Sequence, residues 1–283
     1  MSENIFITKA SGEEAPFSIE KLRHSLSRAG AGEKVIDSIA LAVQQMLYPG
    51  ISTKEIYQRA FSLLKKASAH TAARYKLKKA ILELGPTGFP FEKYVGEILK
   101  YEGYRVQVGQ MVQGHCVLHE VDVIAKKDGR HFMIECKFHS DQGRKCDVKI
   151  PLYIHSRFQD VEKAWRKQPG HDQKFHQGWL VTNTRFTTDA VQYGTCAGLN
   201  LVSWNFPGKD SLKERIGRSA LHPLTCLTTL TKKEKQLLLD KGMVLCKELC
   251  RNEQWLEESG LSPARALKVL EEARLLCKTK IQS

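Results

Sequence analysis

The chain has 283 residues, and its 44 Lys and Arg against 31 Asp and Glu give a formal net charge of +13. This excess of positive charge favours polyanionic partners, because neutralising phosphates releases counterions; the plain alternative is that it only keeps the protein soluble. No apolar stretch approaches the roughly 18–20 residues that a membrane span needs. The N-terminus also lacks a basic leader followed by an apolar core, so we expect a cytoplasmic protein with no membrane partner.

Two further classes of protein are disfavoured by what the sequence lacks. The eight cysteines are scattered, with no CxxC pair and no Cys/His cluster of zinc-finger spacing, which argues against a structural zinc site. No Walker A sequence occurs, which argues against a P-loop ATPase.

Breaks in the hydrophobic pattern divide the chain into three parts. The segment ELGPTGFP interrupts a helical pattern, and Pro207 with Gly208 follows the strand-like run LVSWNF. We therefore expect domains at residues 1–86, 87–208 and 220–279.

The first part is predicted to be a β-hairpin followed by helices. Two short runs in NIFITKASGEEAPFS flank Ser11 and Gly12 and suit a hairpin. The first helix is predicted to begin after Ser18, a good N-cap, and to end at Gly30. Ser52 or Thr53 is expected to cap a later helix, and AHTAARYKLKKAILELG predicts a single helix that finishes at Gly85.

Three stretches of this part, ITKASGEEAPFSIEKLRHSL, GISTKEIYQ and AARYKLKKAI, resemble the ATP-cone, the nucleotide-sensing domain of ribonucleotide reductases. The resemblance runs from residue 3 to about residue 84 and implies that ATP or dATP binds as a regulatory ligand. The family's nucleotide-binding positions, two lysines and a threonine, fall on Lys9, Lys21 and Thr53. The family's Lys-Arg-x-Gly hairpin reads KASG here, so one phosphate-binding Arg is missing. Without the resemblance, both lysines would be interpreted as solvated surface charges.

The second part predicts a mixed α/β sheet domain. A helix over FEKYVGEILKYEG precedes three strands, RVQVGQMV, EVDVIAKKD and RHFMIECKF, the last two joined by a turn at Asp128-Gly129. A helix around FQDVEKAWRK, the strand GWLVTN, the helix TTDAVQYGTCAGL and the strand NLVSW follow. This αβββαβαβ order indicates a sheet with helices on its faces.

Three charged residues lie inside the apolar strands of this domain. Glu135 and Lys137 share one face of their strand by alternation, and the hairpin brings Asp122 close to Glu135. Paired carboxylates suit Mg²⁺ or Mn²⁺, and a lysine beside them can orient a water or counter the charge on a phosphate. On spacing alone, a salt bridge between Lys137 and one of the carboxylates is the alternative.

The blocks FEKYVGEILKYEGYRV, EVDVIAKKDGRHFMIECK and GWLVTNTRFTTDAVQYGTCAGLNLVSW resemble the Mrr-like branch of the restriction-endonuclease superfamily, the PD-(D/E)xK nucleases, over about residues 87–206. The resemblance implies metal-dependent hydrolysis of a DNA phosphodiester that leaves a 5′-phosphate. It implies that Asp122, Glu135 and the Cys136 carbonyl hold the metal, that Lys137 is the catalytic lysine, and that Glu92 acts through a water or a second metal. The alternative for Glu92 is a surface carboxylate favoured by the dipole at a helix start.

Basic residues after the catalytic strand include Lys149, Arg157 and Arg166. They are expected either to bind phosphates or to form a solvated basic face.

The C-terminal part predicts a small all-α module. Thr231 is expected to cap its first helix, Gly242 to end it, and Ser262 with Pro263 to start the last helix. KKEKQLLLDKGMVLCKEL and LEESGLSPARALKVLEEA resemble paired helices of the helix-hairpin-helix class, which implies non-specific DNA contacts. A plain helical interaction module is the alternative.

Together these parts predict a Mg²⁺-dependent DNA endonuclease whose ATP-cone binds ATP or dATP and regulates cleavage through a homo-oligomer, by analogy with the reductases. One alternative is a non-catalytic, nucleotide-responsive DNA-binding protein. Another is a structure-specific or RNA-directed nuclease.

Overall fold

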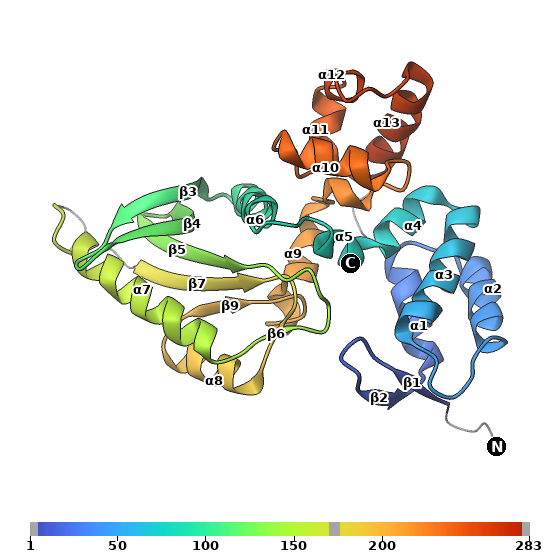
Figure 1. Ribbon diagram of the computed structural model, residues 1–283, viewed down its shortest axis with the longest axis horizontal. Coiled ribbons are helices and arrows are strands. Elements are labelled where there is room, and N and C mark those ends of the chain that lie inside the picture. Colours follow the sequence, from blue (N-terminus) through green and yellow to red (C-terminus); the bar gives the residue numbers. More distant parts are fainter. Residues whose placement is uncertain (1–4, 170–175, 279–283) are drawn as a thin grey trace. The chain divides into compact units, whose positions relative to one another are not determined.

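The computed structural model describes residues 5–169 and 176–278 (Figure 1). It divides into two compact units, one combining residues 1–81 with residues 222–283 and the other formed by residues 82–221. Residues 1–4 and 279, at the outer ends of the predicted domains, lie outside the described residues. No helix within the described ranges is long and apolar enough to cross a membrane.

The first unit begins with the predicted β-hairpin and its helices. Strand β1 (Phe6–Thr8) pairs antiparallel with β2 (Glu14–Pro16). The helices are α1 (Ile19–Arg28), α2 (Glu33–Gln44), α3 (Thr53–Ala67), α4 (Ala69–Tyr75) and α5 (Leu77–Leu82). Ser18 caps α1, and Ser52 forms a capping box with Glu55 at the start of α3. The apolar faces of α1 to α4 meet in one core.

One prediction for this unit is wrong: AHTAARYKLKKAILELG is not a single helix. It forms α4 and α5, which are separated at Lys76. Lys76 is buried, and its Nζ donates to the Thr225 carbonyl oxygen at 2.9 Å, while Thr225 Oγ1 donates to the Ala80 carbonyl oxygen at 2.6 Å. A buried ammonium group needs such a partner. The break therefore falls where the two ends of this unit are joined by buried polar contacts.

The C-terminal part of the unit is all-helical, as predicted. It contains η2 (Leu224–Cys226), α10 (Lys232–Asp240), α11 (Cys246–Arg251), α12 (Gln254–Glu257) and α13 (Pro263–Lys278). Thr231 caps α10 in a capping box with Glu234, and Gly242 with φ +83° follows its end. Glu272 of α13 is buried, and its carboxylate accepts hydrogen bonds from the backbone N–H groups of Thr228 and Thr229.

The second unit has the predicted αβββαβαβ order around a five-stranded sheet. The helices that cover the sheet are α6 (Phe89–Tyr101), α7 (Lys149–Trp165) and α8 (Thr188–Cys196). The strands of the sheet are β3 (Arg105–Gln113), β4 (Leu118–Lys127), β5 (Arg130–Lys137), β7 (His176–Thr182) and β9 (Asn200–Val202). Their order is β3-β4-β5-β7-β9, antiparallel from β3 to β5 and parallel from β5 to β9. The fold-class prediction is confirmed.

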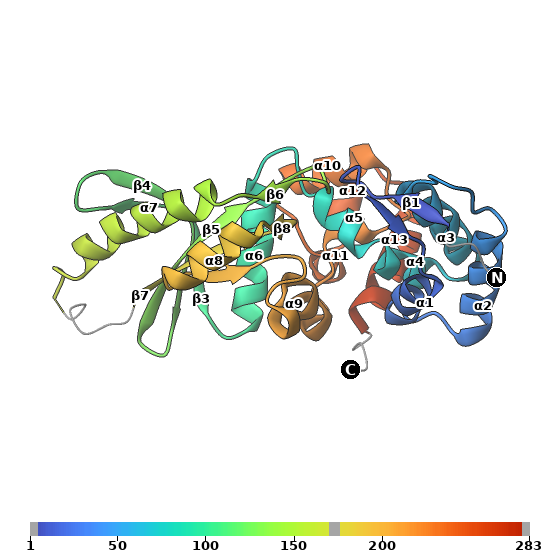
Figure 2. The same cartoon turned by 90° about the horizontal axis from the view of Figure 1, so that it is seen from below.

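Helices cover both faces of this sheet. On one face, Val121, Ile124 and Met133 form a core cluster with Phe158 and Val161 of α7. Helix α8 contacts α7, and the two helices lie side by side in both views (Figures 1 and 2). The other face contacts α6, which packs against β3, β4 and β5. The sheet therefore presents β4 and β5 between two helices that come from distant parts of the sequence.

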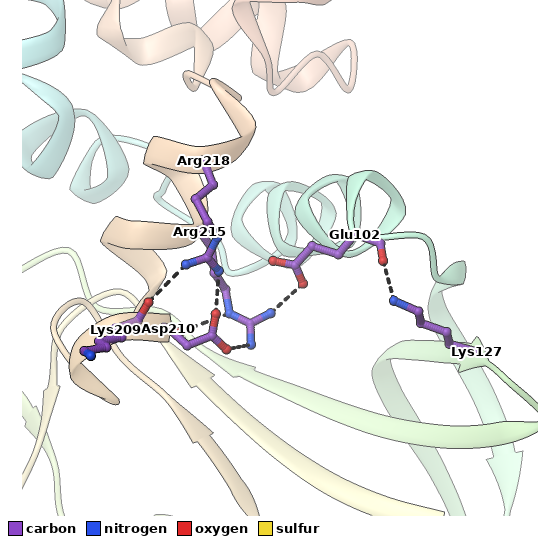
Figure 3. A network of polar contacts seen from close by, with 6 residues as sticks. All are labelled: Glu102, Lys127, Lys209, Asp210, Arg215 and Arg218. Carbon is purple, nitrogen blue, oxygen red and sulfur yellow. Dashed lines mark hydrogen bonds and ion pairs between the residues drawn. The ribbon is translucent and has the colours of Figure 1, made fainter. Parts of the chain in front are cut away.

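Three short elements extend the predicted core. Strands β6 (Lys145–Cys146) and β8 (Arg185–Phe186) pair in parallel, and η1 (Gly208–Asp210) leads into α9 (Leu212–Ser219). Helix α9 packs on α6 through a polar network (Figure 3). In this network Arg215 is buried between Glu102 and Asp210, and Arg218 also pairs with Asp210. Helix α9 thus packs as part of the sheet unit.

Candidate active site

The hairpin of β4 and β5 positions the first two candidate residues. Its turn has Asp128 at φ +50° and Gly129 at φ +74°, as a tight two-residue turn requires, so the predicted turn is confirmed. The register pairs Lys127 with Arg130 and continues to Val123 and Ile134. The next position along this register places Asp122 opposite Glu135.

The β4–β5 ladder ends at Val123, and the β3–β4 ladder skips Asp122 before it resumes at Val121. Gly109 of β3 lies opposite Asp122 with φ +62°, a conformation that a glycine adopts at little cost. The backbone N–H of Cys136 donates to Asp122 Oδ2 at 2.7 Å, so the side chain takes the place of a ladder acceptor. Val121 and Ile124, three positions apart, join the same core cluster, so the alternation of the strand is broken between them.

Glu135 is the most buried of the candidate carboxylates. Its residue is 5% exposed, and its Oε1 has no hydrogen-bond partner among the described residues. Burial, together with repulsion from Asp122, raises the pKa of Glu135 to about 8. An oxygen that is buried and unpartnered beside other carboxylates is in a position to bind a cation.

Glu92, in the first turn of α6, completes a group of three carboxylates. Burial raises its pKa to about 7, with further contributions from the negative charges of Asp122 and Glu120. Burial also raises the pKa of Asp122, although the Cys136 N–H and Arg157 oppose this effect. Burial is thus the main reason why the three carboxyls are harder to ionise, and the charge of Asp122 adds to this effect at Glu92 and Glu135.

Arg157 of α7 has an environment that the sequence does not indicate. It does not belong to a solvated basic face, because its Nη1 donates to Glu135 Oε2 at 2.6 Å and its side chain is 15% exposed. Glu135 therefore does form a salt bridge, but with Arg157 instead of Lys137. The helical spacing of α7 indicates this position, because Arg157 follows Ile154 by three residues and precedes Val161 by four. Both of these residues are buried on the sheet-facing side of α7.

Lys137 lies at the exposed end of β5. Within the described ranges, its ammonium group makes no hydrogen bond or ion pair, and its charge acts on Asp122 by lowering the pKa of that carboxyl. The strand end beneath it is held by β7, because Thr182 Oγ1 donates to the Lys137 carbonyl oxygen at 2.7 Å. Asn183 exchanges two hydrogen bonds with the backbone of His139, at 2.9 Å and 2.7 Å. Asn183 thus fixes the backbone just after β5, a contact that the sequence does not indicate.

The donor set fits a hard divalent cation, which takes oxygen ligands. Asp122 and Glu135 supply carboxylate oxygens at one end of the sheet, and one of these oxygens is buried without a partner. Within the described part of the chain, no three His, Cys, Asp or Glu side chains already have the arrangement of a metal site. One oxygen of each carboxylate is engaged, with the Cys136 N–H and with Arg157 respectively.

Two of the three candidate nucleotide-binding residues lie on neighbouring segments of the first unit. Thr8 of β1 bridges to Ser52, and this bridge brings Lys9 and Thr53, the next residues along each segment, to the same place. Lys9 Nζ pairs with Glu13 at 3.0 Å across the hairpin turn. Lys21 is exposed in the first turn of α1.

Comparisons with known proteins agree with this architecture. Residues 5–80 match the ATP cone domain, residues 85–205 match a restriction endonuclease domain of the Mrr type, and residues 222–277 match a domain described as AF1548-like, C-terminal. The chain thus joins an ATP-cone to a restriction-endonuclease-like domain, as the two resemblances predict.

Two relatives cover the greater part of the chain. An uncharacterized protein of Archaeoglobus fulgidus is 34% identical over 181 residues, which are 64% of this chain and 98% of that protein. A crystal structure of a protein of unknown function, AF1548, superposes with a TM-score of 0.56 at 32% identity, over 68% of this chain and all of that chain. The chain therefore belongs to the family of these AF1548-like proteins.

Proposed function

We propose that the protein is an endonuclease that hydrolyses DNA phosphodiester bonds with Mg²⁺ or Mn²⁺, and that ATP or dATP at the ATP-cone regulates it. The observation that supports this most is the convergence of Asp122, Glu135 and Glu92 beside Lys137, which has no partner among the residues that the structure describes, in a restriction-endonuclease-like domain. The formal charge of +13 suits a polyanionic substrate.

Each side chain has a distinct task in this reaction. Asp122, Glu135 and the Cys136 carbonyl hold the cation, which supplies Lewis-acid stabilisation of the charge on the phosphate. Lys137 is free to orient the attacking water or to stabilise the negative charge that develops on the scissile phosphate. Glu92, whose pKa of about 7 lies near physiological pH, can accept and return a proton through a water.

Cleavage of DNA by the full chain with Mn²⁺ tests the proposal. Asp122→Ala and Lys137→Ala are each expected to abolish cleavage, whereas Lys126→Ala, which removes an exposed lysine of β4, should leave it unchanged. Duplex, single-stranded, branched and RNA oligonucleotides are compared in the same assay to identify the substrate. Cleavage that persists after both Asp122→Ala and Lys137→Ala would refute the assignment.

Regulation is tested by the effect of ATP and dATP on cleavage. Lys9→Ala and Thr53→Ala alter adjacent positions and are both expected to weaken nucleotide binding, measured by calorimetry. Lys34→Ala, an exposed lysine of α2, is the matched control. A nucleotide response that is unchanged in both Lys9→Ala and Thr53→Ala contradicts the proposed binding site.

A further inference from the structure

Arg157 is anchored at more than one point. Besides its bond to Glu135, its Nη2 donates to the carbonyl oxygen of Glu120, and its Nε donates to His119 Nδ1 at 3.5 Å. His119 Nε2 in turn bonds to Asp160 Oδ2 at 2.8 Å. A guanidinium group whose donors form a planar fork is held in one orientation by such partners.

The anchoring reaches back to the rigid body of α7. Asp160 lies one turn after Arg157 on this helix and also accepts hydrogen bonds from the backbone N–H groups of Cys116 and Val117, at 2.9 Å and 3.3 Å. Asp160 thereby links α7 to the β3–β4 connection, and His119 lies between Asp160 and Arg157. The position of the Arg157 guanidinium is set by these two elements together.

The two oxygens of Glu135 have different environments as a result. Oε2 accepts the hydrogen bond from Arg157, and Oε1 is buried with no hydrogen-bond partner among the described residues. A carboxylate fixed through one oxygen presents the other in a defined direction, and hydrogen bonds of this kind to metal ligands orient them for the metal.

We propose that Arg157 is a positioning residue that holds Glu135 through Oε2, so that Oε1 is the oxygen presented to a divalent cation. This inference rests on the proposed metal-dependent function, and it adds a residue on α7 to the site formed by β4, β5 and α6. The positive charge of Arg157 also repels a cation. Replacing Arg157 therefore shows which effect is larger: the metal affinity falls if the orientation of Glu135 dominates, and it rises if the repulsion of the cation dominates.

Calorimetry with Mn²⁺ and the full-length protein, in the absence of DNA, measures this effect. Arg157→Met is expected to weaken Mn²⁺ binding by about 10- to 100-fold, the usual consequence of removing a side chain that orients a metal ligand. In cleavage assays of Arg157→Met, the Mn²⁺ concentration that gives half of the maximal rate should rise by the same factor. The rate at saturating Mn²⁺ should return to that of the wild type. Arg157→Lys, which keeps the charge but not the fork, should fall between the wild type and Arg157→Met.

Arg166→Met is the matched control, because Arg166 directly follows the end of α7, is exposed and pairs only with Glu162 in the described structure. It should leave Mn²⁺ affinity unchanged. If Arg157→Met does not fold, Arg157→Lys decides alone: weaker Mn²⁺ binding supports the proposal and wild-type affinity overturns it.

Three results would overturn the inference, and they separate it from the proposed function. Unchanged affinity in Arg157→Met, with binding lost in Asp122→Asn, leaves a metal site that Arg157 does not organise. Tighter binding in Arg157→Met shows that repulsion dominates. If the wild-type protein binds no Mn²⁺, it has no metal site, and both this inference and the proposed function are wrong.

Discussion

The buried carboxyl of Glu135 makes the stability of the metal-free sheet unit depend on pH. Its pKa is about 8 in the folded protein against an ordinary value of 4.5, so the folded protein binds this proton more tightly than the unfolded chain does. The stability is therefore fully present below pH 4.5 and is lost as the pH rises toward 8. At 1.36 kcal/mol per pKa unit, about 3 kcal/mol is lost between pH 5 and pH 8.

Glu135→Gln removes this titrating group. Between pH 5 and pH 8, the free energy of unfolding should therefore fall by about 3 kcal/mol less in Glu135→Gln than in the wild type. Urea unfolding in EDTA at several pH values measures it. The sheet unit is observed selectively in a Trp255→Phe background, because the other three tryptophans, Trp165, Trp179 and Trp204, lie in residues 82–221.

The comparison of the two proteins cancels the titration of groups that they share. At pH 5 the carboxyl of Glu135 is mostly neutral and resembles the amide, so the difference between the proteins should be smallest there and grow toward pH 8. Equal pH slopes in the wild type and Glu135→Gln would show that Glu135 ionises normally in the folded protein and that the carboxylates do not repel one another as the structure indicates.

The remaining predictions concern residues that shape the backbone around the sites. Gly109→Ala places a Cβ at φ +62° and should lower the free energy of unfolding by about 1–2 kcal/mol in urea titrations. Asn183→Ala frees the backbone of His139 and should slow cleavage by up to about 100-fold while Mn²⁺ affinity measured by calorimetry stays unchanged, because the strand end carrying the catalytic lysine is displaced. Glu272→Gln replaces one of the two acceptor oxygens by an NH₂ donor facing the backbone N–H groups of Thr228 and Thr229, and we expect a loss of about 1–3 kcal/mol and faster amide exchange there. Exchange at Thr228 that is unaffected would contradict this role for Glu272.

The local elements were predictable where one residue type strongly determines the backbone. Ser18 and Thr231 cap the helices expected of them, and Asp128 with Gly129 forms the expected hairpin turn. The alternation of β5 then places Glu135 and Lys137 together, because side chains two positions apart share a face. These features depend on interactions between residues close in the sequence.

Helix α7 shows where sequence reasoning was incomplete. The pattern FQDVEKAWRK predicts a helix that begins near Phe158, whereas the helix begins at Lys149 and accommodates Pro151 in its first turn. The pattern therefore leaves Arg157 outside the predicted helix. The longer helix places it against Glu135, a contact that joins residues 22 positions apart.

The residue types and spacings of this chain were enough to predict an ATP-cone, a mixed-sheet domain with Asp122, Glu135 and Lys137 at its centre, and a helical C-terminal part. They could not reveal that Glu135 pairs with Arg157 rather than with Lys137, or that Asp122 accepts from the Cys136 N–H. The first contact depends on how α7 packs on the sheet, and the second on the interruption of the β3–β4 ladder at Gly109 and Asp122. A charged side chain interacts most strongly with the opposite charge nearest to it in the folded protein. That distance is set by the packing of elements that are far apart in the sequence.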